Sequence, residues 1–197
     1  RLPGPTFFIY CQEVLEKYRN DDRIMHIGGA NFQGNKKRGD GSYYFSKYSH
    51  IWGWATWRRA WKHYDLEMKT FPDFIKQKQI NNICQDQAIR RYWMEKFMIV
   101  YENKLDTWDY QWLYAIWRQG GICIIPNYNL VTNIGFGQGA THTKGRNIAA
   151  NKGLEKMEKI TSPTFMIVDR KADNYYDRSL RFFYKLISKI KVYLHEV

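Results

Sequence analysis

The sequence has no long hydrophobic run. The longest apolar stretches, such as those at 24–27 and 122–125, span only a few residues, whereas a membrane-spanning helix needs about 20. The chain also does not open with the charged, apolar and small-residue segments of a secretion leader. We therefore expect neither a transmembrane span nor a secretion signal.

Cysteine is scarce as well. Cys11, Cys84 and Cys123 are odd in number and show no C-x-x-C spacing, so we expect neither a disulfide framework nor a zinc knuckle. The sequence also has no H-E-x-x-H, G-x-S-x-G or P-loop motif. Scarce thiols fit a reducing compartment, and we expect a cytoplasmic protein that can associate peripherally with the inner membrane.

Positive charge is abundant. Lysine and arginine number 31 against 19 acidic residues, a net charge of +12 over 197 residues. Such a charge favours a polyanionic partner, which can be nucleic acid, an anionic membrane surface or a phosphate-rich substrate. With 44% hydrophobic residues, the chain is long enough for one sizeable core and short for two, so we expect a single compact unit.

Hydrophobic spacing and turn residues predict an α/β protein with a short mixed sheet flanked by helices. Short apolar segments alternate with segments of helical spacing, which favours a layered arrangement over a helical bundle. The charged, glycine-rich segment 34–41 is expected to be a mobile loop. Expected helices cover 5–19, 54–63, 73–83, 86–101 and 108–118, and expected strands lie within 23–31, 42–48, 122–125 and 129–134, with a further short candidate at 162–168.

One carboxylate stands out in the segment LDTWDYQWLYAIW at 105–117. Thr107 can cap the following helix, which leaves Asp109 in the first turn, where free N–H groups and the helix dipole favour the ionised form. Asp109 is then either an ordinary helix-start acid or a base that takes a proton from a substrate hydroxyl. The neighbouring tryptophans favour the base, since an exposed indole stacks on a sugar ring, although Trp112 can also be a core residue.

The segment NIGFGQGATHT at 133–143 is rich in glycine. Its G-x-G-x-G spacing is not the dinucleotide-binding G-x-G-x-x-G, and no amphipathic helix follows at once. The segment is either an ordinary turn or a lid whose backbone amides and His142 approach a diphosphate or its metal ion. His26 lies in an apolar segment and is predicted to be a core histidine.

Three segments, taken in order, resemble one known family. They are PTFFIYCQEVLEKYRNDDRIMHIGGANFQ (5–33), YYFSKYSHIWGWATWRRAWKHYD (43–65) and TWDYQWLYAIWRQGGICIIPNYNLVTNIGFGQGATHT (107–143). The series resembles the later part of a bacterial family of nucleotide-diphospho-sugar transferases with the GT-A fold. More distantly it is similar to the animal N-acetylglucosaminyltransferases that begin complex N-glycans. The likeness runs to about residue 142 and, more loosely, through 162–178.

The resemblance implies the C-terminal portion of a GT-A fold. Residues 1–145 would form the acceptor and catalytic portion without the upstream nucleotide-binding half, and residues 146–197 a C-terminal extension. The acidic metal-binding motif of the family would precede Arg1, so Asp21 and Asp22 are not that motif. The resemblance therefore implies that a longer parent protein is an enzyme and that these 197 residues alone turn over no donor.

The reaction that the resemblance implies is transfer of a sugar from a nucleotide-diphosphate donor to a hydroxyl of a glycan or lipid-linked acceptor, in surface-polysaccharide synthesis. A Mn²⁺ or Mg²⁺ ion would neutralise the departing diphosphate, and His142 would approach that metal. By resemblance Asp109 matches the catalytic base proposed for the more distant N-acetylglucosaminyltransferases. Direct displacement assisted by this base would invert the anomeric configuration.

The segment HIWGWATWRRAW at 50–61 would build the floor of the sugar site. By resemblance Gly53 and Trp54 shape this floor: the glycine lets backbone and ligand approach closely, and Trp52 or Trp54 offers a flat face. The substrate-binding residues expected in all are Trp52, Gly53, Trp54, Trp108, Trp112 and Asn31.

The remaining residues of this segment have more ordinary expectations. Trp57 and Trp61 are four residues apart, so we expect both to pack inward along one helix face. Arg58 and Arg59 can either meet phosphate or coat the helix surface.

The end of the chain, 178–197, has the pattern of an amphipathic helix with a basic flank. It can be a terminal helix packed on its domain or an interfacial helix on anionic lipid. The apolar stripe is Leu180, Phe183, Ile187, Ile190 and Leu194, and the flank is Arg181, Lys185 and Lys189.

Two other classes of protein compete with the transferase. A non-catalytic carbohydrate-binding module, or a degenerate transferase fragment, would use the same tryptophans without turnover. A nucleic-acid binder would account for charge and aromatics together. Against the latter, the basic residues are spread along the chain and the aromatic-basic strand motif of RNA-recognition domains is absent.

Overall fold

A computed structural model of the chain describes residues 2–34, 36–134 and 153–195. They divide into two compact units, one from the described parts of 1–63 and 120–172 and the other from those of 64–119 and 173–197. The single unit expected from chain length is therefore wrong. The domain boundary at residue 145 stays a prediction, and residues 153–172 pack with the first unit.

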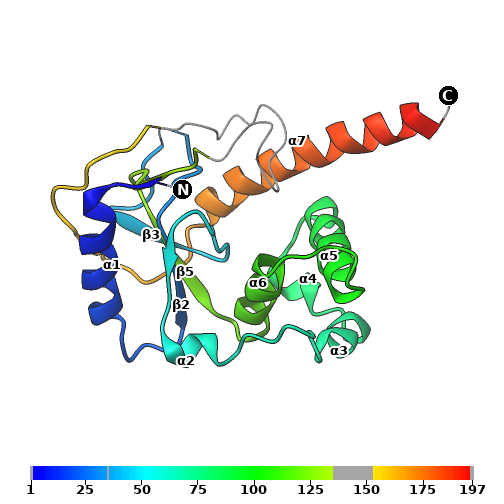
Figure 1. The fold of residues 1–197 in the computed structure, drawn as a ribbon, viewed down its shortest axis with the longest axis horizontal. Helices are drawn as coiled ribbons and strands as arrows, with labels where there is room; N and C mark the ends of the chain where they lie inside the picture. Colours follow the sequence, from blue (N-terminus) through cyan, green and yellow to red (C-terminus); the bar gives the residue numbers. More distant parts are fainter. Residues whose placement is uncertain (1, 35, 135–152, 196–197) are drawn as a thin grey trace. The chain divides into compact units, whose positions relative to one another are not determined.

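The first unit is an α/β layer built on a mixed sheet, as expected (Figure 1). The four strands lie in the order β3-β5-β2-β4, with β5 parallel to β2 and the other pairs antiparallel. Their bounds are β2 Ile24–Gly28, β3 Tyr43–Ser46, β4 Trp54–Ala55 and β5 Ile122–Pro126. A separate antiparallel pair joins β1 (Leu2–Pro3) to β6 (Val131–Thr132).

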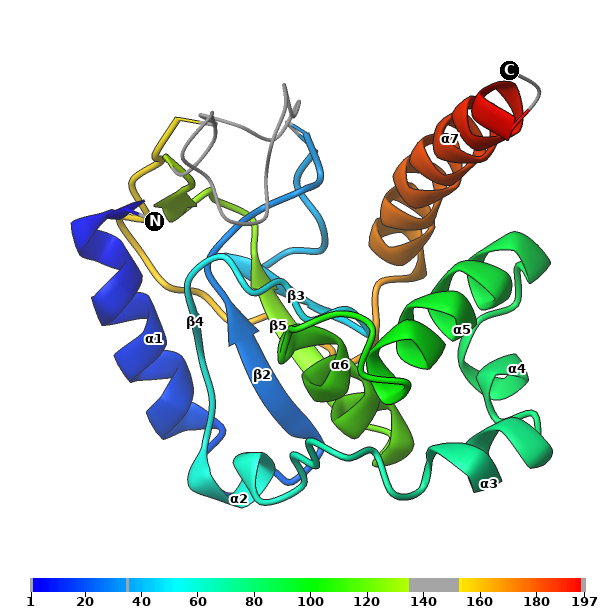
Figure 2. The same ribbon diagram turned by 45° about the vertical axis from the view of Figure 1, so that its right-hand side comes forward.

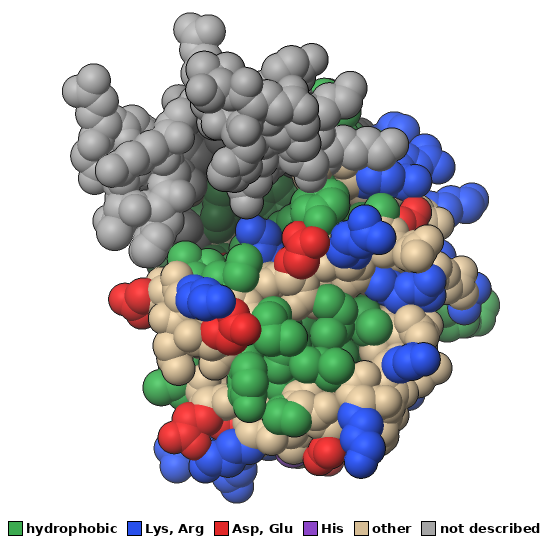
Figure 3. Space-filling model, turned by 90° about the vertical axis from the view of Figure 1, so that its right-hand side faces the viewer, with side chains coloured by type: hydrophobic (Ala, Val, Ile, Leu, Met, Phe, Trp, Pro, Cys, Tyr) green, Lys and Arg blue, Asp and Glu red, His purple; other side chains and the backbone are tan. Residues whose placement is uncertain are grey.

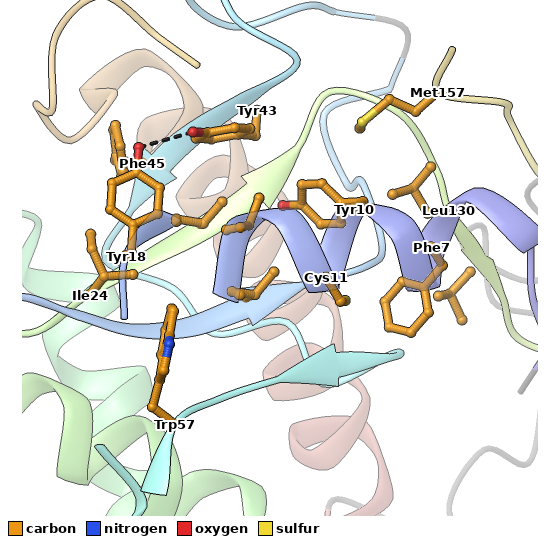
Figure 4. Close-up of a cluster of buried hydrophobic side chains, with 14 residues drawn as sticks. Phe7, Tyr10, Cys11, Tyr18, Ile24, Tyr43, Phe45, Trp57, Leu130 and Met157 are labelled. Carbon is orange, nitrogen blue, oxygen red and sulfur yellow. Dashed lines mark hydrogen bonds between the residues drawn. The ribbon is translucent and has the colours of Figure 1, made fainter. Parts of the chain in front are cut away.

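Helix α1 (Pro5–Lys17) covers this sheet and forms most of the core with it. Proline in its first turn needs no hydrogen-bond partner for its nitrogen, and the buried positions Phe7, Tyr10 and Val14 recur at helical spacing. The core also holds a polar bond: the hydroxyls of Tyr18 and Tyr43 lie 2.9 Å apart (Figure 4). The helix predicted for 5–19 is confirmed.

Residues 153–169 run along the first unit and are tied to it. Met157 is buried in the core, and the Ser42 hydroxyl donates to the Lys159 carbonyl at 2.8 Å. The strand expected at 162–168 is reduced to one bridge between Phe45 and Val168.

The described part of the glycine-rich loop at 34–41 is also anchored. The Asn127 amide donates to the carbonyls of Arg38 and Gly41 at 2.7 and 2.9 Å. These bonds fix a loop that we expected to be mobile.

The second unit is helical. Its helices are α3 (Phe71–Lys76), α4 (Ile80–Ile83), α5 (Gln87–Tyr101), α6 (Asp109–Arg118) and most of α7 (Arg170–His195). The Asp86 carboxylate caps α5 by accepting from the backbone N–H groups of Ala88 and Ile89. The helices predicted for 86–101 and 108–118 are confirmed, whereas the one predicted for 73–83 is broken at Lys78, which has φ +53°.

Aromatic rings fill the core of this second unit. Phe97 on α5 packs edge-on against Tyr114 and Trp117 of α6, with ring centroids 5.7 and 5.6 Å apart. Other apolar side chains stay at the surface, and Figure 3 shows hydrophobic groups gathered among charged ones on the face over α3–α5. Exposed examples in this unit are Leu66, Ile75, Ile99, Tyr101, Leu105, Trp108 and Phe182.

The helix predicted for 54–63 is wrong. Trp54 and Ala55 instead form β4, and α2 covers only Arg58–Trp61. The backbone on either side is not helical: Gly53 has φ +66°, and Trp57 has an extended backbone with φ −106° and ψ 151°. Pairing of β4 with β2 outweighs the helical spacing of the tryptophans.

Candidate functional site

The turn at Gly53 sets the geometry of the tryptophan-rich segment. The Gly53 carbonyl accepts from the N–H of Gly29 at 2.7 Å. A Cβ added at Gly53 would lie 2.4 Å from Cγ2 of Val131. Glycine is therefore required by a left-handed backbone and by close packing against β6, a reason that the ligand-based expectation did not include.

Trp54 lies between two other rings. Its indole stacks on His26, with centroids 5.6 Å apart and 13° between the planes, and meets Trp61 at 5.8 Å and 36°. Trp52 meets the edge of Phe32 at 5.1 Å. Trp52, Gly53 and Trp54 are all partly exposed, so this segment presents an aromatic surface of limited area.

The two tryptophans expected to pack inward behave differently. Trp57 is buried, and its indole N–H donates to the Leu15 carbonyl at 2.9 Å, which confirms the prediction for this residue. Trp61 is 39% exposed, so the prediction is wrong for it. Because Trp61 lies beside Trp54, the exposed aromatic surface includes one residue that spacing had assigned to the core.

Two buried histidines lie next to this aromatic surface. His26 is fully buried on β2, and burial lowers its pKa to about 4. Its Nε2 lies 3.2 Å from the His50 carbonyl. Burial, together with the nearby His26, lowers the pKa of His50 to about 3. Both rings are neutral at pH 7, and His26 is a core histidine as predicted.

Arg59 has neither of its expected roles. Its guanidinium donates at 2.8 Å to the carbonyls of Arg19, Tyr18 and Ile24. It also lies 4.5 Å from the centroid of the Trp57 ring. Arg59 thus ties α2 to the end of α1, whereas Arg58 is exposed.

Asn31 is buried, with 2% of its surface exposed. Its backbone N–H donates to the Asn129 side chain at 3.2 Å, and its Oδ1 accepts from the Gln33 N–H at 2.7 Å. The assignment of Asn31 to substrate contact is corrected: it holds the turn that follows β2.

Asp109 stands at the first position of α6, partly exposed. The N-cap is Trp108, which makes no capping bond with its side chain. The expected Thr107 cap is therefore wrong, and the Thr107 hydroxyl donates instead to Oδ1 of Asp109. This bond fixes one carboxylate oxygen and leaves the second for another donor.

The two tryptophans expected beside Asp109 divide between surface and core. Trp108 is 38% exposed, whereas Trp112 is fully buried in α6. The assignment of Trp112 to sugar stacking is corrected, since a fully buried ring offers no face to a ligand.

The negative charge of Asp109 helps to raise the pKa of four tyrosines. Burial raises the pKa of Tyr92 to about 12, a bond with Tyr110 opposes that rise, and the charge of Asp109 adds to it. Burial is also the main cause of the raised pKa of Tyr110, Tyr64 and Tyr176, and the charge of Asp109 adds to each. These neutral hydroxyls come from α5, α6, α7 and residue 64, and no spacing in the sequence connects them.

The expected site residues thus fall into two groups. Trp52, Gly53 and Trp54 belong to the first unit, and Trp108 and Asp109 to the second. His142 lies outside the described residues.

Over residues 2–34, 36–134 and 153–195, no cluster of three or more His, Cys, Asp or Glu side chains is placed to hold a metal ion. Within the same residues, no helix is both long and apolar enough to cross a bilayer. Comparison of the chain with models of known protein families, with curated proteins and with solved structures finds no match. The GT-A family assignment stays a prediction from the residues that carry the resemblance.

Proposed function

We propose that this chain is the later part of a GT-A glycosyltransferase. The longer parent enzyme would transfer a sugar from a nucleotide-diphosphate donor to a hydroxyl of a glycan or lipid-linked acceptor, in surface-polysaccharide assembly. One observation carries the proposal. The Asp109 carboxylate opens α6, is partly exposed, is oriented by Thr107 and lies next to the exposed indole of Trp108.

In the proposed reaction Asp109 acts as the general base. The acceptor hydroxyl oxygen forms a bond to the anomeric carbon while the bond from that carbon to the donor diphosphate breaks. The hydroxyl proton passes to the free oxygen of Asp109, and the electron pair of the broken bond leaves with the diphosphate. A single displacement of this kind inverts the anomeric configuration.

The surroundings of Asp109 suit such a base. The nearby tyrosines remain neutral and keep their protons, because burial and the charge of Asp109 raise the pKa of both Tyr92 and Tyr110. Trp108 offers a ring on which an acceptor sugar can stack.

The divalent cation that the resemblance implies, Mn²⁺ or Mg²⁺, finds no ligand set in the described parts of the chain. His142, the expected ligand, lies outside those parts.

Asp109→Asn tests the proposal directly. Removing a general base is expected to slow transfer by about 10²- to 10⁴-fold with little change in acceptor binding. The measurement is transfer from a panel of radiolabelled sugar nucleotides by the protein as its own cell makes it. Asp106→Asn is the matched control, since Asp106 is an exposed carboxylate three residues earlier. Equal rates for the two variants would remove Asp109 from the chemistry.

A non-catalytic carbohydrate-binding module is the second candidate. It is favoured by the aromatic surface of the first unit, where Trp61 is 39% exposed beside Trp54. Glycan binding that survives Asp109→Asn but is lost in Trp61→Ala, with no donor turnover by the wild-type protein, would support the module over the enzyme. Tryptophan fluorescence titrated with glycan reads out this binding.

A further inference from the structure

The end of α7 has a charge pattern unlike the rest of its unit. Residues 178–195 hold five Lys or Arg and no Asp or Glu, whereas residues 64–119 hold eight basic and eight acidic residues. The excess positive charge of the second unit is therefore concentrated on one helix. A patch of this kind points to an anionic partner.

The first half of α7 is held by α5. The Arg181 guanidinium lies 3.2 Å from a carboxylate oxygen of Asp86. The Tyr184 hydroxyl donates to the Glu95 carboxylate at 2.6 Å, and the Tyr184 ring meets Tyr92 at a centroid distance of 5.8 Å. These contacts fix the direction in which the helix continues.

Beyond Tyr184 the helix runs on to His195. Figures 1 and 2 both show these last turns diverging from α5 within the second unit. About 3.6 residues per turn place residues 183, 187, 190 and 194, all apolar, along one side of the helix, with positions 185 and 189, both lysine, on another. The amphipathic pattern thus continues where the helix leaves its neighbour.

We propose that residues 185–195 of α7 bind in the interface of an anionic lipid bilayer. Apolar residues along one side of a helix, flanked by lysines and without acidic residues, match an apolar boundary beneath anionic head groups. This charge complementarity favours lipid over a neutral protein groove. The proposal is independent of sugar transfer and stands whether or not Asp109 is catalytic.

The test is co-sedimentation of the protein with vesicles. Vesicles of phosphatidylcholine containing about a third phosphatidylglycerol are expected to bind it at roughly physiological salt, and vesicles of phosphatidylcholine alone are not. Binding should weaken in high salt, because salt screens the attraction between the lysines and the anionic head groups.

Two sets of variants separate the charged and apolar contributions. Lys185→Gln, Lys189→Gln and Lys191→Gln together should weaken vesicle binding about 100-fold, since each lysine near an anionic surface contributes about 1 kcal/mol. Lys62→Gln, Lys76→Gln and Lys78→Gln change the net charge equally at other exposed positions and should leave binding nearly unchanged. Ile187→Ser with Ile190→Ser should weaken binding by about tenfold or more.

Four outcomes would overturn the proposal. Absence of binding to anionic vesicles is one, and equal loss in the two lysine variants is another. The third is binding of single-stranded RNA that depends on Lys185, Lys189 and Lys191 and is tighter than vesicle binding. If the isoleucine variant instead lowers the thermal midpoint and leaves vesicle binding intact, the end of α7 packs on protein and the lipid role is wrong.

Discussion

The two tryptophan-rich segments of this chain are similar in composition but differ in how far their tryptophans are exposed. In the segment 50–61 three of the four tryptophans keep some exposure, and Trp61 is 39% exposed. In the segment 107–117 Trp112 and Trp117 are buried, and Trp108 stays at the surface. The difference lies in the backbone. A left-handed glycine and a short strand hold the first segment open, whereas a regular helix turns the second segment's rings into the core.

An abundance of tryptophan is therefore weak evidence for a ligand surface. In α6 all of residues 111–117 are buried, so each ring there belongs to the core whichever side of the helix it occupies. In an irregular segment the assignment depends on partners far along the chain, here Val131 against Gly53 and His26 against Trp54.

The largest difference in the free energy of unfolding is expected between the variants Trp112→Ala and Trp61→Ala. Trp112→Ala removes a fully buried indole and should lower the free energy of unfolding by about 3–5 kcal/mol. Trp61→Ala, at 39% exposure, should cost about 1 kcal/mol or less. Urea unfolding followed by circular dichroism measures both. Similar losses would contradict the assignment of one ring to core and the other to surface.

Gly53→Ala should have the next largest effect on the free energy of unfolding. The added Cβ meets Val131 at 2.4 Å on a backbone with φ +66°, so overpacking and left-handed strain together should cost about 2–4 kcal/mol. Gly120 is a matched control, because it has φ +65° and nothing lies within 4 Å of its added Cβ. Gly120→Ala should show the strain alone, about 1–2 kcal/mol. Equal losses in urea unfolding would show that contact with Val131 does not require glycine.

Acid should destabilise the protein through two buried histidines, His50 in the first segment and His26 beside it. The pKa values of His26 and His50 are about 4 and about 3 in the fold, below the ordinary value of about 6.5. As the pH falls below that value, both histidines become protonated in the unfolded chain but stay neutral in the folded protein. The contribution of these groups to the free energy of unfolding should therefore be flat above pH 6.5 and fall at pH 5 by about 2 kcal/mol for each histidine.

The variant His26→Gln with His50→Gln isolates this effect from carboxylate titration. Its free energy of unfolding at pH 7 can differ from that of the wild type, but its decline between pH 6.5 and 5 should be shallower. The same slope in both proteins would mean that the buried histidines do not carry the acid sensitivity.

The smallest effect should come from Arg59. Arg59→Lys keeps the charge but cannot span three carbonyls with a planar fork, so it should cost about 1–2 kcal/mol. Arg58→Lys changes an exposed neighbour and should cost close to nothing. Thermal unfolding of the two variants side by side measures the difference, and equal midpoints would show that the Arg59 bonds do not stabilise the fold.

Much of the fold was predictable because strong local signals agreed with the final structure. Helix α5 has its Asp86 cap, α1 has its early proline, and β5 is a short apolar run. Prediction failed where tertiary pairing outweighed helical spacing, as at Trp54 and Ala55, which pair with β2. The division into two units also escaped prediction, because length and composition alone do not reveal which segments pack together.

The candidate site was predictable only in part. The position of Asp109 at a helix start followed from local spacing, but the role of Thr107 as its hydrogen-bond donor did not. Burial of Trp112 and Asn31 depends on neighbours that no local pattern specifies. The tyrosines around Asp109 come from positions far apart in the chain, so only the fold brings them together.

The most direct test of the central claim, that Asp109 deprotonates an acceptor for direct displacement, is the anomeric configuration of the first transfer product. Proton NMR of a product formed from a sugar nucleotide of known configuration should show inversion. Formation of the product should fall in Asp109→Asn and persist in Asp106→Asn. A product of retained configuration, or transfer undiminished in Asp109→Asn, would contradict the account.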